Sequence, residues 1–359
     1  MSPNGAVDGA EVEPLRVLIV GMGSVGQRHA RNLRALLGDR VCLIAYRATG
    51  QSPVIVDHWQ ADTTRTIEDA YQLQSFASLD DALATKPNVA FICNPTSLHL
   101  ATAITCADAG CDLFIEKPVA ESIQGLDRLA DTVRTKGLVV AIGCQLRFHP
   151  ALELLKKKIG DGSIGRVLAV RAEVGEYLPG WHPYEDYRHS YAARGSLGGG
   201  VILTLIHEID YLTWIFGAPR RLFAVGGHLS SLEVDVEDVA SILSECSISG
   251  RGVPIHLQMD YVRSPSRRTC SVLGDTGSLD VDLRRNCLTL TNADEGTTSL
   301  FEDPVFDRNA LFLAELTDFL SARSTRTLPR VTLEDGITAL RVALAARESL
   351  RSGTLVEIA

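Results

Sequence analysis

Residues 17–30 have the sequence VLIVGMGSVGQRHA, and this stretch decides the fold. Its four consecutive apolar residues, 17–20, are typical of a strand buried on both faces, as in a parallel sheet. The G-x-G-x-x-G run that follows opens a helical pattern. Gly21 permits a tight turn, Gly23 lets a pyrophosphate approach the backbone, and Gly26 lets helix and strand pack closely. The stretch therefore predicts dinucleotide binding at a helix N-terminus; the alternative is a glycine-rich turn without a ligand.

The composition is that of an ordinary globular protein with a sizeable core. The chain has 359 residues, of which 45% are hydrophobic and 22% charged, and this length favours two domains. The net charge of −9, without a lysine or arginine cluster, disfavours nucleic acids and anionic membranes as partners. No apolar run reaches the roughly 18 residues that span a bilayer. The eight cysteines form no CxxC pair and indicate small buried hydrophobes in a reducing compartment, not a disulfide or zinc framework.

These properties predict a cytoplasmic protein without a metal site. Residues 1–14 are polar and acidic, so they contain no secretory apolar segment, and we expect them to form a disordered tail.

Buried strands alternate with helices along the first part of the chain. Strands are predicted at 41–47, 88–95, 112–118 and 138–143, and helices near 79–84, 99–109 and 121–136. This alternation predicts a doubly wound parallel sheet, a Rossmann domain, over residues 15–148. Ligands of such sheets lie beyond the carboxyl ends of the strands. We therefore expect the cofactor to contact Gly21, Gly23, Ser24, Val25, Gly26, Arg47, Asn94, Pro95, Thr96, His99, Glu116, Lys117 and Gln145.

The end of the second strand bears on the choice between NAD and NADP. An acid at this place binds a ribose 2′-hydroxyl, whereas an arginine accommodates a 2′-phosphate. The strand ends in Tyr46 and Arg47, with no carboxylate, so the sequence slightly favours NADP. NAD stays open as the alternative, with Arg47 stacked on the adenine.

The pattern changes after residue 148. A helix at 150–159 leads into seven runs with strand character between 167 and 291, joined in part by short turns. Further helices are predicted at 201–216, 308–323 and 333–352. We expect residues 149–359 to form an α+β domain with a largely antiparallel open sheet. This domain would bind the substrate and join subunits into a homodimer or homotetramer, and its C-terminal helix would pack back on the Rossmann domain.

The predicted helix 201–216 follows a triple glycine and carries a polar side. That side would hold Thr204, His207, Glu208 and Tyr211, while the opposite side would bury Ile202, Ile206 and Ile209. Alcohol–carbonyl redox chemistry needs a group that exchanges protons near neutral pH, which a histidine supplies. We therefore predict a functional His207; the alternative is a structural histidine.

Several motifs together resemble the Gfo/Idh/MocA oxidoreductases, the family of glucose–fructose oxidoreductase and inositol dehydrogenase. They are GMGSVG at 21–26, CNPTSLH at 93–99, EKP at 116–118, and the triple glycine before the histidine helix. The chain is most similar to the branch that carries W-H-P and G-G-G-V-x-L-T-L-x-H-E-I-D-Y, which is associated with sugar and aminosugar biosynthesis.

The resemblance implies roles for single residues. Lys117 would contact the reacting oxygen, with its bond to Pro118 often cis, and His207 would be the acid/base. Many members carry an aspartate in the turn before this histidine, where the present chain has Thr204. A threonine cannot stabilise an imidazolium as a carboxylate does, so the histidine would be oriented differently, or Lys117 or Tyr187 would share the proton transfer.

The substrate is expected beside an aromatic loop at 177–188. Aromatic rings with donors nearby suit polyhydroxylated ligands, although a packed surface loop is the alternative. The residues expected near the substrate are Arg147, Trp181, His182, Tyr187, Arg188, Arg194 and His207.

The leading hypothesis is hydride transfer between NAD(P) and a hydroxyl or ketone of a sugar, aminosugar or cyclitol, free or attached to a nucleotide or an aminoglycoside-like scaffold. Two alternatives stay open. One is a glycosidase that retains NAD and acts by transient oxidation and elimination; the other is a non-catalytic protein that only binds dinucleotide.

Overall fold

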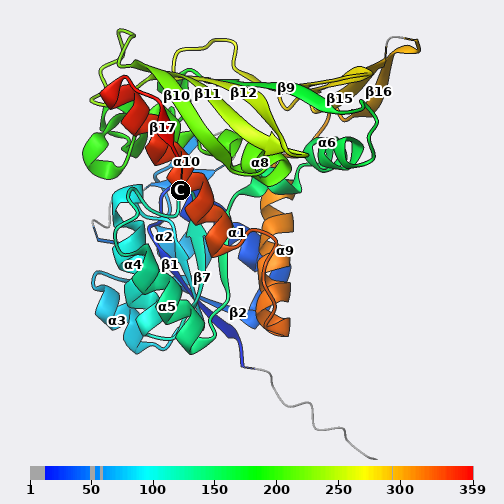
Figure 1. The fold of residues 1–359 in the computed structure, drawn as a ribbon. Helices are drawn as coiled ribbons and strands as arrows, with labels where there is room; N and C mark the ends of the chain where they lie inside the picture. Colours follow the sequence, from blue (N-terminus) through cyan, green and yellow to red (C-terminus); the bar gives the residue numbers. More distant parts are fainter. Residues whose placement is uncertain (1–12, 49–52, 57–59, 293, 359) are drawn as a thin grey trace, which may run out of the picture.

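The computed structural model describes residues 13–48, 53–56, 60–292 and 294–358. Within this part of the chain, two β-sheets lie one above the other, and the C-terminal helices run beside them (Figure 1). Of the predicted tail, residues 1–12 lie outside the described residues.

The first sheet contains six parallel strands in the order β5-β2-β1-β6-β7-β8. The strand order reverses beside β1, the point where ligands of such sheets bind. The strands are β1 Leu15–Val20, β2 Val41–Tyr46, β5 Leu73–Phe76, β6 Val89–Ile92, β7 Asp112–Glu116 and β8 Val140–Gly143. The helices of this part are α1 Ser24–Leu37, α2 Ile67–Tyr71, α3 Leu79–Ala84, α4 Thr96–Asp108 and α5 Leu126–Lys136. The predicted doubly wound sheet is confirmed.

The stretch that opens the chain behaves as its pattern indicates. Residues 17–20 are fully buried at the centre of the sheet, between β2 and β6. The sequence analysis missed short elements between 50 and 78: the hairpin β3 Val54–Val56 and β4 Gln60–Asp62, with α2 and β5 after it. These elements have three to five residues, too few to show a hydrophobic period.

The second sheet contains nine strands in the order β16-β15-β14-β13-β9-β12-β11-β10-β17, and β9 and β12 are its one parallel pair among the described residues. The predicted, largely antiparallel sheet is confirmed. Its strands are β9 Val167–Gly175, β10 Pro219–Gly227, β11 Val239–Ile248, β12 Arg251–Asp260, β13 Arg267–Gly274, β14 Gly277–Asp282, β15 Cys287–Asn292, β16 Gly296–Glu302 and β17 Val356–Glu357. The edge strands β16 and β17 were not predicted.

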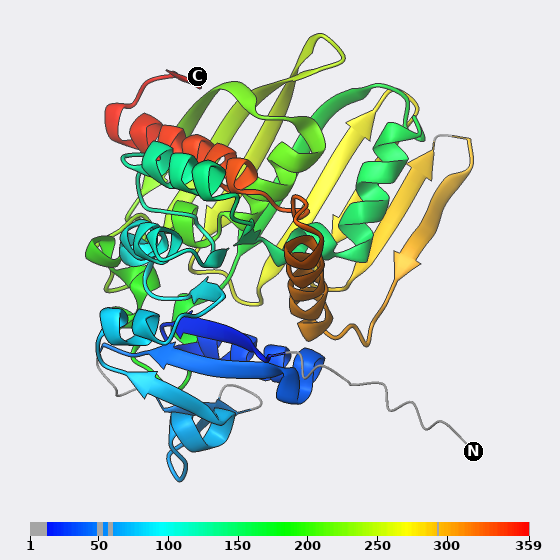
Figure 2. The same cartoon turned by 90° about the horizontal axis from the view of Figure 1, so that it is seen from below.

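Helices cover one face of this second sheet. They are α6 Pro150–Gly160, α8 His207–Phe216 and α10 Leu333–Ser352, and all lie on the side that faces the first sheet (Figure 1). Seen from below, α9 Asn309–Thr325 stands apart from them, beside the Rossmann part (Figure 2). The opposite face of the sheet carries no helix within the described part of the chain.

The predicted single helix at 201–216 is wrong. The chain forms α7 Val201–Thr204, a break at residues 205 and 206, and then α8. Segments Gly195–Thr204 and His207–Phe216 meet at a 48° bend. Because of the break, Thr204 and His207 do not share a polar helix side, and Glu208 and Tyr211 are fully buried instead. The three isoleucines are buried as predicted.

Helix α9 completes the core of the first sheet, although it comes from the end of the chain. Phe319 is fully buried, and its ring meets those of Phe91 and Phe114 edge-on, at centroid distances of 5.9 and 5.6 Å. Leu316 and Ala322 lie in the same apolar cluster. The first sheet therefore depends on a residue more than 200 positions further along the chain than the two phenylalanines it contacts.

Replacing Phe319 with alanine should lower the free energy of unfolding by about 3–5 kcal/mol, because it opens a cavity under two aromatic rings. Chemical denaturation followed by circular dichroism measures the loss. The exposed neighbour Thr317 on the same helix is the control, and Thr317→Ala should change stability by less than about 0.5 kcal/mol. Equal losses in both variants would contradict this packing role.

Candidate active site

A cavity of about 1200 Å³ lies between the two sheets. It exceeds the roughly 300–1,000 Å³ usual for one small-molecule ligand, so it has room for a cofactor and a second molecule. The carboxyl ends of β1, β2, β6 and β7 line one side, and parts of the segments 176–185 and 189–191, with the α7–α8 break, line the other. This is the position that the strand order predicts for a ligand.

The glycine loop shapes the floor of the cavity. A Cβ on Gly21, which has φ +92°, would lie 2.8 Å from the backbone of Cys93 and Asn94. A Cβ on Gly26 would lie 2.0 Å from the carbonyl oxygen of Gly21, so helix α1 touches the turn there. A Cβ on Gly23 meets nothing within 4 Å. Gly21 and Gly26 therefore allow close packing, and Gly23 leaves an open backbone beside the N-terminus of α1.

His99 holds two cavity-lining turns together. Its Nδ1 lies 2.7 Å from the carbonyl oxygen of Pro118, and its Nε2 lies 2.8 Å from that of Asn94. Burial lowers the pKa of this imidazole, although the two carbonyl contacts oppose the shift. The neutral ring has a single N–H and donates to one of the two carbonyls at a time. Asn94, Pro95 and Thr96 line the cavity from the same turn.

Glu116 is a buried carboxylate at the end of β7. Burial would raise its pKa, but the hydrogen bond and charge of His29, together with Lys117, lower the pKa overall. His29 Nε2 lies 2.7 Å from Glu116 Oε1. Glu315 on α9 is also buried, and burial together with the charge of Glu116 raises its pKa well above the ordinary value. Glu116 is therefore an anion, whereas Glu315 is protonated and neutral.

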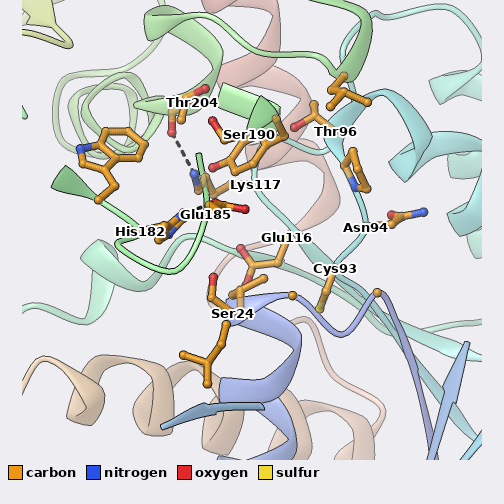
Figure 3. Close-up of a pocket in the computed structure, with 18 of the residues that line it drawn as sticks. Ser24, Cys93, Asn94, Thr96, Glu116, Lys117, His182, Glu185, Ser190 and Thr204 are labelled. Carbon is orange, nitrogen blue, oxygen red and sulfur yellow. Dashed lines mark hydrogen bonds and ion pairs between the residues drawn. The ribbon is translucent and has the colours of Figure 1, made fainter. Parts of the chain in front are cut away.

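Lys117 and His207 both line the cavity. Lys117 Nζ donates a hydrogen bond of 2.8 Å to the backbone carbonyl of Thr204 (Figure 3). The peptide bond between Lys117 and Pro118 is cis, in agreement with the resemblance. His207 is buried, its Nδ1 has no hydrogen-bond partner among the described residues, and its ring lines the cavity. Burial, followed by the charges of Lys117, Arg268 and Arg308, lowers the pKa of His207 well below its ordinary value. The imidazole is therefore neutral at neutral pH and able to accept a proton.

The cavity brings together most of the predicted residues. Those that line it are Gly21, Gly23, Ser24, Val25, Arg47, Asn94, Pro95, Thr96, His99, Glu116, Lys117, Gln145, Trp181, His182, Thr204 and His207. The Trp181 ring packs edge-on against Tyr261 at 5.5 Å, and His182 Nδ1 lies 2.7 Å from Glu185 Oε1 (Figure 3).

Four residues predicted near the substrate lie outside this lining. Arg147 is buried in a two-pronged ion pair with Asp210 and a third contact of 2.9 Å to Asp335. Tyr187 accepts a hydrogen bond from the backbone of Glu233. Arg188 is paired with Asp186, and Arg194 with Asp235. Each of these side chains is engaged in holding the fold or a surface loop.

Sequence reasoning missed the arginines of the opposite wall, which come from three distant segments: Arg263 and Arg268 around the start of β13, Arg284 after β14, and Arg308 before α9. No motif marks them, because only the tertiary fold places them together.

No single helix in the described ranges is long and apolar enough to cross a membrane. The bent pair Gly195–Thr204 and His207–Phe216 reaches that length and composition only when both pieces are joined.

A Rossmann sheet whose glycine cradle opens toward a lysine and a neutral histidine defines a dinucleotide-binding oxidoreductase. Two family models agree: an oxidoreductase family with an NAD-binding Rossmann fold matches residues 15–144, and the GFO/IDH/MocA C-terminal domain matches residues 152–280. The chain therefore belongs to the GFO/IDH/MocA family of NAD-dependent oxidoreductases, and the predicted resemblance is confirmed.

Similar proteins cover nearly the whole chain. The myo-inositol 2-dehydrogenase of Thermotoga maritima is 26% identical over 355 residues, which span 96% of this chain and 98% of that protein. The UDP-N-acetylglucosamine 3-dehydrogenase of Acidithiobacillus ferrooxidans is 28% identical over 341 residues, with coverages of 92% and 95%. The WlbA dehydrogenase of Bordetella pertussis, solved with NADH and UDP-GlcNAcA, has the same fold, with a TM-score of 0.77, 21% identity, and coverages of 97% and 99%.

Proposed function

We propose that this protein transfers a hydride between nicotinamide and a secondary hydroxyl or ketone of a sugar, aminosugar or cyclitol, free or carried on a nucleotide or an aminoglycoside-like scaffold. The observation that carries the proposal is the convergence of Lys117 and His207 on one cavity whose floor is the open glycine cradle. The names of the relatives, an inositol dehydrogenase and a UDP-aminosugar dehydrogenase, support the substrate class.

The residues present fit a nicotinamide dinucleotide. The open backbone at Gly23 and the first turn of α1 suit a pyrophosphate, and Asn94, Pro95 and Glu116 border the way toward Lys117. When bound, the cofactor accepts or returns the hydride.

The chain's own residues manage the proton and the oxygen charge. His207, held neutral, takes the hydroxyl proton in oxidation and donates it in reduction. Lys117 uses one N–H for the Thr204 carbonyl and keeps its others for the reacting oxygen, where they stabilise developing alkoxide charge.

Removing either group should slow hydride transfer by about 10²–10⁴-fold while NADH still binds, because each acts on the reacting oxygen. Lys117→Met and His207→Asn are assayed by single-turnover nicotinamide absorbance on the cyclitol or UDP-aminosugar that the wild type turns over fastest. Thr204→Val is the control, since it keeps the carbonyl that Lys117 uses.

Near-normal rates in both Lys117→Met and His207→Asn would end the assignment. The same assay measures the stoichiometry of cofactor change. One NADH per product molecule supports a dehydrogenase, whereas product release without net NADH supports the NAD-retaining glycosidase.

We further propose that the cofactor is NAD, although the sequence slightly favours NADP. Arg47 Nη1 lies 2.7 Å from Glu68 Oε1, and Glu68 also accepts a hydrogen bond from Ser75. Glu68 therefore supplies the acid that the end of β2 lacks. A 2′-phosphate beside Arg47 would meet this carboxylate and be repelled, whereas a 2′-hydroxyl would not.

Wild-type protein should bind NADH at least about 10-fold more tightly than NADPH, a difference of about 1.4 kcal/mol. Glu68→Gln should narrow this ratio, because Arg47 then faces a 2′-phosphate without an opposing charge. Fluorescence titration measures both affinities. Ser75→Ala is the matched control, since it removes a hydrogen bond to Glu68 and keeps the carboxylate. Tighter binding of NADPH by the wild type would refute the preference.

We also propose that the open face of the second sheet joins two copies of the chain. Phe223 and Leu243 lie opposite each other on β10 and β11 and are exposed, as are Val225, also on β10, and Leu273 on β13. Exposed apolar side chains on one uncovered sheet face are typical of a subunit contact.

Sedimentation velocity should show a dimer or tetramer for the wild type, and Leu243→Asp should shift it toward monomer by burying a charge in the contact. Val305→Asp, at an exposed valine outside the sheet, should leave the assembly unchanged. A monomeric wild type would overturn this contact.

A further inference from the structure

Four cationic side chains line the part of the cavity beside His207. They are Lys117, Arg268, Arg284 and Arg308, and they come from four separate segments of the chain. Burial lowers the pKa of His207 first, and the charges of three of them, Lys117, Arg268 and Arg308, lower it further. The fold thus concentrates positive charge beside the proposed acid/base.

Four arginines line this side of the cavity: Arg263, Arg268, Arg284 and Arg308. The first two already have carboxylate partners. Arg268 is buried, and its Nε lies 2.9 Å from Glu208 Oε1, with Glu176 3.7 Å from its Nη1. Arg263 Nη2 lies 2.8 Å from Glu173 Oε1, and its Nε lies 3.2 Å from Asp260 Oδ2. These pairs hold their arginines in place and cancel much of their charge.

The other two arginines differ. Among the described residues, no carboxylate lies within ion-pair distance of the guanidinium group of Arg284 or Arg308, although both line the cavity. Both are solvent-exposed residues of the cavity wall. Partial desolvation there, and then the charges of Arg268, Arg28 and Arg284, opposed by that of Glu176, lower the pKa of Arg308 to about 10. The cavity wall therefore carries uncompensated positive charge.

We propose that the substrate carries an oxyanion, a carboxylate or a phosphate, which Arg284 and Arg308 bind. The inference rests on the proposed function and narrows it to acidic or phosphorylated sugars and cyclitols, including those linked to a nucleotide. Guanidinium groups bind such oxyanions through paired hydrogen bonds, which a neutral ring hydroxyl cannot match. Arg268 is held by Glu208 and Glu176, so the anion would bind to Arg284 and Arg308 instead.

The experiment titrates NADH-loaded protein with inorganic phosphate at constant ionic strength and follows binding by calorimetry. The wild type should bind phosphate, and Arg308→Gln and Arg284→Gln should each weaken that binding at least about 10-fold, as the loss of a charged hydrogen bond predicts. Arg285→Gln is the matched control: Arg285 is the exposed neighbour of Arg284, contacts Asp282, and lies outside the cavity lining. Melting temperatures should stay unchanged, because neither cavity arginine loses an ion pair.

A second titration identifies the anion by comparing glucuronate, glucose 6-phosphate and glucose on the same NADH-loaded protein. Tighter binding of glucuronate indicates a carboxylate, and tighter binding of glucose 6-phosphate indicates a phosphate. No phosphate binding by the wild type, or equal binding by all variants, would overturn the proposal. Weaker NADH binding in Arg308→Gln would assign the arginines to the cofactor and overturn it as well. Failure of the hydride-transfer assay alone would leave these titrations intact, so the two proposals fail separately.

Discussion

The hydrogen bond from Lys117 Nζ to the carbonyl of Thr204 joins the two halves of the active site. In a continuous helix this carbonyl would accept the N–H of residue 208. Because the helix breaks at residues 205 and 206, Glu208 N–H instead meets the Leu205 carbonyl, at 3.4 Å. The break frees an acceptor that the lysine at the end of β7 satisfies. It also turns His207, the first residue of α8, toward the same cavity.

The contact does not depend on which side chain stands at position 204. Lys117 donates to the backbone carbonyl of residue 204, which is present whatever the side chain is. A threonine in place of an aspartate at this position changes the charge around His207 and leaves the position of Lys117 unchanged. At residue 204 the backbone carbonyl therefore fixes the position of Lys117, and the side chain decides whether a negative charge lies near His207.

The sequence predicts those parts of the site that depend on neighbouring residues. The glycine cradle and the strand end at Glu116 and Lys117 follow from buried runs and turn chemistry within a few positions. The break before His207 was not predictable, because residues 201–206 are almost entirely apolar and contain neither glycine nor proline. A segment that is buried all round has no polar side to reveal a change of direction.

Long-range charge pairs account for most of the other differences. Arg147 follows a strand end that borders the cofactor, yet Asp210 and Asp335 draw it into the interior. Arg47 has its acid partner 21 residues away, in a stretch without a clear hydrophobic period. In each case the sequence shows the cation, and only the fold shows the carboxylate that decides its role.

The same charges set what His207 can do. An imidazole surrounded by Lys117, Arg268 and Arg308 stays neutral and is a weak base, so alone it is poorly suited to remove a proton from an alcohol. Thr204, in the preceding turn, supplies no carboxylate to offset these charges. In the proposed complex, an oxyanion held by Arg284 and Arg308 would supply the missing negative charge and bring the pKa of His207 closer to neutral. The substrate would then complete the acid/base in the chain's place, so that a neutral analogue of the same shape would bind and still react poorly.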